Sequence, residues 1–167
     1  AVGRSEIGIL YLSEHNEAVL SKLINKNDLN FEELYIAKPH VFISNNHPLA
    51  NKEEITIQDL MLYPYLVFEQ GKHNSFYFSE EFLSSLEFSK NIMVRDRATL
   101  FNLLIGLNGF TVCSGIIDTE LNGENIISKP LKSDCSMRIG ILTRKNSVLS
   151  RYGVSYLNIL KNHLSID

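Results

Sequence analysis

Short, almost wholly apolar runs alternate along this chain with segments of helical periodicity, and this alternation constrains the fold more than any other feature. Residues 7–12 form the first such run, and a strand without a polar face is typical of a sheet covered on both sides. Further strands are expected at residues 41–43, 65–68, 92–94, 110–113, 126–127 and 138–142. Helices are expected at 16–27, 57–62, 76–86, 98–107 and 150–164. Strands that alternate with helices predict an α/β protein with a mostly parallel sheet.

The composition argues against several classes of protein. Of the 167 residues, 44% are hydrophobic and 21% are charged, which is ordinary for a globular protein with a real core. Apolar runs stay short of the roughly 18 residues of a membrane span, so no membrane association is expected. The net charge of −3 argues against a nucleic-acid surface on this polypeptide itself. Two cysteines are too few for a disulfide framework and fit a reducing cytoplasm.

The start of the chain predicts a fragment. Residues 1–6 carry no initiator methionine, and the apolar strand at 7–12 follows at once. Such a strand needs neighbours in a sheet, and nothing upstream can supply them.

Motifs for catalysis, metals and cofactors are missing from the sequence. It has no Gly-x-Ser-x-Gly elbow, no His-Glu-x-x-His helix and no P-loop. Its five histidines are scattered, and none pairs with a cysteine at zinc spacing, so His47 is expected to be solvated or to cap a turn. Cys113 lies in an apolar strand, which predicts a buried, inert thiol. We therefore expect no catalytic residue, no metal and no cofactor.

The loop at residues 69–75 is the best candidate for a binding site. It follows the strand at 65–68 and precedes a helix, and ligands of open α/β sheets lie beyond the carboxyl ends of the strands. A helix N-terminus, together with Lys72, His73, Asn74 and Ser75, suits a carboxylate or phosphate. A plain capping loop with a solvated lysine explains the same residues equally well. The loop Cys113-Ser114-Gly115 holds a similar position after a later strand.

Three successive motifs resemble the effector-binding domain of LysR-type transcriptional regulators. They are His47-Pro48-Leu49-Ala50, then Ile55-Thr56-Ile57-Gln58-Asp59-Leu60, then Tyr63-Pro64. The strand at Glu6-Ile7-Gly8-Ile9 and the element Leu104-Ile105-Gly106-Leu107-Asn108-Gly109-Phe110 are also similar to the family pattern. The likeness runs from Glu6 to the last helix, although Cys113-Ser114-Gly115 departs from the Leu-Pro turn that often follows in the family.

The resemblance implies two Rossmann-like lobes that are joined by a hinge of two crossing strands, as in type 2 periplasmic binding proteins. Lobe I would comprise residues 1–36 and 137–167, and lobe II residues 37–136. The first elements of lobe I and the family's N-terminal winged helix-turn-helix have no counterpart in this sequence.

The same resemblance implies a regulatory domain and not an enzyme. A small, anionic metabolite would bind in the cleft between the lobes and control DNA binding by the full-length, cytoplasmic regulator, which would be a homodimer or tetramer. DNA would be contacted only through the N-terminal domain. The implied ligand contacts are Tyr11, Glu69, Gln70, Lys72, His73, Asn74, Ser75, Thr99 and Thr111, with His73 where the family often has Thr or Ser.

Two other functions share this scaffold. A transport-type solute-binding protein has the same two lobes, but the His-Pro-Leu-Ala and Ile-x-Ile-x-Asp-Leu motifs favour the regulator. An enzyme is the weakest alternative, because no paired carboxylates and no base–nucleophile pair support it.

Overall fold

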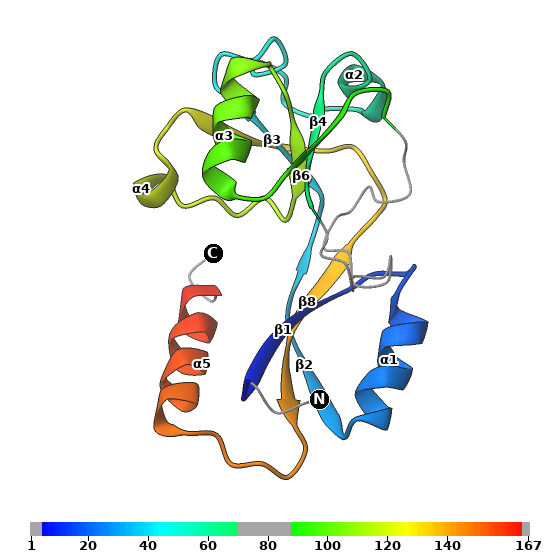
Figure 1. Cartoon of the computed structure of the whole chain (residues 1–167), viewed down its shortest axis with the longest axis vertical. Coiled ribbons are helices and arrows are strands. Elements are labelled where there is room, and N and C mark those ends of the chain that lie inside the picture. The colour runs from blue at the N-terminus through cyan, green and yellow to red at the C-terminus, as the bar shows by residue number, and fades with distance from the viewer. Residues whose placement is uncertain (1–4, 70–87, 165–167) are drawn as a thin grey trace. The chain divides into compact units, whose positions relative to one another are not determined.

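The computed structural model describes residues 5–69 and 88–164, and the chain divides into two compact units (Figure 1). Unit 1 comprises Ala1–Ala37 and Met137–Asp167, and unit 2 comprises Lys38–Ser136. The chain therefore passes twice from one unit to the other. The helix expected at residues 76–86 lies outside the described residues.

Unit 1 is built on a three-stranded sheet in the order β1-β8-β2. The strands are β1 (Ile7–Leu12), β8 (Met137–Arg144) and β2 (Leu29–Ala37), and β8 is antiparallel to both neighbours. The expectation of a mostly parallel sheet is wrong here. An apolar run shows that a strand is covered on both faces, but the path of the chain decides its direction, and β8 returns from unit 2 against the direction of β1 and β2.

Two helices cover opposite faces of this sheet: α1 (Glu17–Lys26) and α5 (Arg151–Leu164). Successive residues of β2 show the alternation, because Glu33 pairs with Arg138 on the face of α1 and Glu32 pairs with Lys161 of α5. Figure 1 shows the two helices on either side of the strands. The turn before α5 is held by Glu6, whose Oε2 accepts the Ser150 N–H at 2.7 Å, and this hydrogen bond lowers the pKa of Glu6.

Glycine is required at position 140 in the central strand β8, because atoms of the neighbouring strand β2 occupy the space that a side chain would need. A Cβ at this position would lie 2.4 Å from Cζ of Phe31 and 2.6 Å from the carbonyl oxygen of Glu32. Glycine therefore allows the Phe31 ring to lie flat across β8, on the same face as α1.

Unit 2 contains two small sheets. In the first, β3 (His40–Ser44) lies between β6 (Thr111–Cys113) and β7 (Ile126–Pro130) and is antiparallel to both, which again contradicts a mostly parallel arrangement. In the second, β4 (Tyr65–Phe68) and β5 (Asn91–Val94) are parallel, as expected. A single parallel bridge from Tyr65 to Phe110 sets β4 beside the start of β6. The helices among the described residues of unit 2 are α2 (Ile57–Leu60), α3 (Arg97–Gly106) and α4 (Thr119–Asn122).

Apolar side chains from these elements form two clusters that fix the strands of unit 2. One cluster joins β3 to the turn around α2 and the other packs α3 against β3, β4 and β5. Thr56 begins α2 with a capping box in which its hydroxyl accepts from the Asp59 N–H and its own N–H donates to the Asp59 carboxylate. This cap confirms the helix start that the sequence predicts at residue 57.

His47 is a buried structural residue and not a solvated one. Its side chain is 3% exposed, its Nδ1 accepts the Leu49 N–H at 3.0 Å, and its Nε2 lies 3.0 Å from the Asn108 carbonyl oxygen. Burial lowers the pKa of His47, which keeps the ring neutral. The imidazole thus caps its own turn, which is one of the two roles that the sequence predicts for it. It also connects that turn to the residues just after α3.

Candidate functional site

The carboxyl ends of β4 and β5 place two charged residues side by side. Glu69 follows β4 directly and Arg95 follows β5, and the Glu69 N–H donates to the Val94 carbonyl oxygen at 2.8 Å. The Arg95 guanidinium meets the Glu69 carboxylate with two nitrogens, Nε on Oε2 and Nη2 on Oε1, the second at 3.2 Å. These hydrogen bonds lower the pKa of Glu69 and raise that of Arg95.

The N-terminus of α3 adjoins this pair. Asp96 caps the helix, since its Oδ1 accepts the Thr99 N–H at 2.8 Å and its Oδ2 accepts the Thr99 hydroxyl at 2.7 Å. Both bonds lower the pKa of Asp96. The proton of the Thr99 hydroxyl is therefore used by the cap, and a ligand could meet only the lone pairs of this oxygen.

The structure brings some of the expected site residues together and separates others. Glu69 and Thr99 lie at the same end of the parallel strands. Thr111 lies opposite Phe42, near the start of β6. The bridge between Tyr65 and Phe110 is parallel, and the same register continued for four residues pairs Glu69 with Ser114. By this register the Cys113-Ser114-Gly115 loop is closer than Thr111 to the carboxyl end of β4.

Tyr11 belongs to unit 1 and lies within β1 opposite Ile139. The strand predicted at residues 7–12 is thus confirmed, with Tyr11 inside it. Five further candidates lie outside the described residues: Gln70, Lys72, His73, Asn74 and Ser75.

Cys113 is half-buried in β6, so the expectation of a buried thiol is met only in part. Burial raises the pKa of its thiol to about 12, so almost none is thiolate at neutral pH. Within residues 5–69 and 88–164, no group of three or more His, Cys, Asp or Glu side chains is placed to hold a metal ion.

Sequence reasoning missed Arg95. Its signal was present, because Arg95 directly follows the predicted strand at 92–94, and a second arginine, Arg97, directly precedes the predicted helix at 98–107. A charged residue at such a junction lies at the carboxyl edge of a sheet. The pairing with Glu69 depended on β4 and β5 being parallel neighbours, which only the structure shows.

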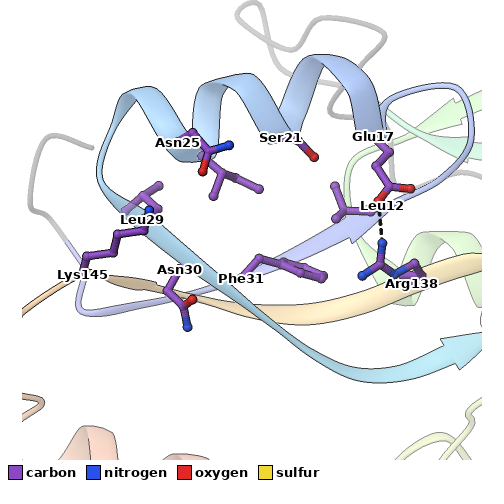
Figure 2. Close-up of a pocket in the computed structure, with 10 residues that line it drawn as sticks. Leu12, Glu17, Ser21, Asn25, Leu29, Asn30, Phe31, Arg138 and Lys145 are labelled. Atoms are coloured by element: carbon purple, nitrogen blue, oxygen red, sulfur yellow. Dashed lines mark hydrogen bonds and ion pairs between the residues drawn. The ribbon is translucent and has the colours of Figure 1, made fainter.

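A separate hollow of about 280 Å³ lies in unit 1, between α1 and the strands β2 and β8 (Figure 2). Arg138 and Glu17 form an ion pair at one end, and Lys145 lies at the other. Between them, Phe31 and Leu12 form an apolar floor. No sequence motif predicts this hollow, because its residues come from β1, α1, β2 and the region of β8.

Comparison with known proteins assigns the chain to a family. The family model described as the LysR substrate binding domain matches residues 3–165. The chain belongs to this family. Its members are ligand-binding domains of transcriptional regulators and not enzymes. The match favours a regulator over a transport-type solute-binding protein, and the fold is that of type 2 periplasmic binding proteins.

Individual relatives agree with this assignment. The malolactic fermentation system transcriptional activator of Lactococcus lactis is 26% identical in an alignment 167 positions long, and the match covers 95% of this chain and 56% of the activator. The chain thus spans about half the length of this relative. The effector binding domain of QuiR, in complex with shikimate, is 19% identical with a TM-score of 0.63, and the match covers 97% of this chain and 73% of that one.

A second solved structure is the regulatory domain of CcmR from Synechocystis PCC6803, in complex with 2-PG. It is 18% identical with a TM-score of 0.61, over 96% of this chain and 74% of that one. At these identities the two structures support the fold alone. None of the helices described here is long and apolar enough to cross a membrane.

Proposed function

We propose that this chain is the effector-sensing domain of a LysR-type regulator, and that it binds a small anionic metabolite at the carboxyl ends of β4 and β5. The observation that carries the proposal is the Glu69–Arg95 pair. Its side chains are 42% and 82% exposed, so the guanidinium is open to solvent and held by one carboxylate. A carboxylate or phosphate on a ligand can take over both hydrogen bonds of that fork.

The exchange is energetically feasible because exposed ion pairs contribute little to stability. Displacing Glu69 from Arg95 therefore demands little from the ligand, and the ligand gains the same two charge-assisted hydrogen bonds. QuiR, whose effector binding domain shares this fold, is in complex with shikimate, and shikimate carries a carboxylate like the effector proposed here. The remaining proposed contacts are Tyr11, Gln70, Lys72, His73, Asn74, Ser75, Thr99 and Thr111.

Binding would act on transcription through the rest of the regulator. An effector shifts an equilibrium between conformations only by its differential affinity for them. We propose that DNA is contacted by the family's winged helix-turn-helix, which has no counterpart in these 167 residues, and that the regulator is a cytoplasmic homodimer or tetramer. The net charge of −3 is consistent with DNA contacts made elsewhere.

A thermal-shift screen tests the proposal. The chain is heated with pooled amino acids, organic acids, aromatic acids and sugar phosphates. A ligand at about one hundred times its dissociation constant adds about 2.7 kcal/mol, which shifts the melting temperature by roughly 5–10 °C for a chain of this size.

The matched variants are Arg95→Gln and Arg97→Gln, which remove the same charge two residues apart. Arg97 lies over the Phe101 ring, 5.1 Å from its centroid, and does not bond to Glu69 in the structure. Arg95→Gln should abolish the shift caused by an anionic hit, and Arg97→Gln should keep it. Equal loss in both variants, or a hit that Arg95→Gln leaves unchanged, contradicts this site.

A further inference from the structure

The hollow in unit 1 has features of a second binding site, independent of the one proposed in unit 2. Every residue that lines it belongs to unit 1. Its wall on α1 consists of Glu17, Ser21 and Asn25, which follow one another at intervals of four residues and so share one face of the helix. Eight residues of helix measure about 12 Å, so the hollow is elongated along α1.

The floor of the hollow is apolar. Leu12 and Ile24, which are 3% and 9% exposed, line it. Phe31 lies between the two ends (Figure 2). The Arg138 guanidinium lies over the Phe31 ring, 5.6 Å from its centroid. Methylene groups of a ligand would therefore leave water when they enter the middle of the hollow.

The two ends carry opposite net charge. At one end Arg138 binds two carboxylates, with Nη1 on Glu17 and Nε on Glu33 at 2.6 Å, so one positive charge faces two negative ones. Lys145 lies at the other end. It also lines an adjoining hollow, together with Arg144 and Asp28. That end has two positive charges and one negative charge.

We propose that this hollow binds a short linear zwitterion, of the class of ω-amino acids and small peptides. Its ammonium group would lie at Glu17 and its carboxylate at Lys145, with the connecting chain across Phe31. Charge complementarity at both ends and the apolar middle select this class. A simple carboxylate lacks a partner for Glu17, and a simple amine lacks one for Lys145. Ser21 and Asn25 provide hydrogen bonds along the wall for a peptide group.

The probe is 6-aminohexanoate, and hexanoate and hexylamine are its controls because each lacks one of the two charges. Binding is followed by amide chemical shifts of the isotopically labelled chain. We expect 6-aminohexanoate to move resonances of residues 21, 25 and 31, and to bind at least about fivefold more tightly than either control. Hexanoate or hexylamine binding equally well would overturn the assignment, as would shifts confined to unit 2.

Two variants locate the charges. Lys145→Gln should weaken binding of 6-aminohexanoate about fivefold or more and leave binding of hexylamine unchanged. Glu17→Gln should likewise weaken binding of 6-aminohexanoate and leave binding of hexanoate unchanged. Among the described side chains Lys145 forms no ion pair, so its replacement should leave the fold intact even if Glu17→Gln does not. Lys132→Gln, at an exposed lysine of unit 2, is the matched control and should bind like the wild type. An unchanged affinity of Lys145→Gln refutes the proposal.

Discussion

Replacing His47 by alanine should destabilise unit 2, because the imidazole serves one buried and one part-buried backbone group at once. The variant leaves the Leu49 N–H and the Asn108 carbonyl without the ring atoms that lie 3.0 Å from each. It also removes a ring packed against Tyr63, with centroids 4.4 Å apart. Leaving the buried Leu49 N–H unsatisfied costs about 1–3 kcal/mol, and the part-buried Asn108 carbonyl, which water can reach, costs less.

The wild-type histidine also predicts how stability depends on pH. Burial holds the pKa of His47 below its ordinary value of 6.5, so the unfolded chain binds the proton more readily than the folded chain. Stability from the neutral ring is complete above about pH 6.5 and declines as the pH falls toward the folded pKa. The decline is at most about 1.4 kcal/mol per pH unit for one proton. A protonated ring cannot accept the Leu49 N–H, which gives this decline a structural cause.

Urea unfolding measured by circular dichroism tests both statements, since the chain has no tryptophan. The free energy of unfolding is measured at pH 7.5, 6.5 and 5.5 for the wild type, His47→Ala and His15→Ala. His15 is exposed, and its variant should keep both the stability and the pH slope of the wild type. The difference between wild type and His47→Ala should shrink as the pH falls. A difference that stays constant or grows refutes the assigned role of the neutral ring.

Two further predictions concern packing and thiol chemistry. Gly140→Ala should lower the free energy of unfolding by about 1–3 kcal/mol, because its methyl group would overlap the Phe31 ring. The control is Gly8→Ala, whose Cβ would be 3.6 Å from the nearest atom, and it should cost less than half as much in the same urea assay. An aromatic disulfide reagent should react quickly at pH 8 with one thiol per native chain, that of the exposed Cys135, and with two after unfolding. Fast reaction of both native thiols would contradict the raised pKa, about 12, of the half-buried Cys113.

The sequence predicted the positions of strands better than their relative directions, and unit 1 shows the physical reason. Residues 7–12 and 138–142 are apolar runs that indicate strands, and both strands exist. Apolar character records burial, which is the same for parallel and antiparallel neighbours, so it could not show that β8 runs against β1. The cap at Thr56 was predictable because its hydrogen bonds join residues three apart in sequence.

The candidate site was predictable in part for the same reason. Glu69 was identified because it directly follows a strand, which is local information. Arg95 was missed because its partner is 26 residues away, and the contact exists only once β4 and β5 pair in parallel. The unit 1 hollow was missed entirely, since Glu17 and Arg138 are 121 residues apart and nothing local marks either one.

Because Arg95 is exposed, its replacement can change effector binding without changing the stability of the fold, which is not possible for a core residue. The apolar clusters of unit 2 hold β4 and β5 together without help from the exposed ion pair. Arg95→Gln should therefore change the free energy of unfolding little while removing the proposed anion contact. Replacing Glu69 by glutamine should act in the opposite sense on binding, because it removes the internal competitor for the guanidinium and leaves Arg95 open to the effector. Tighter binding by Glu69→Gln, weaker binding by Arg95→Gln and unchanged melting of both ligand-free variants are expected together. A Glu69→Gln variant that binds more weakly would instead make Glu69 a direct ligand contact and refute the exchange at Arg95.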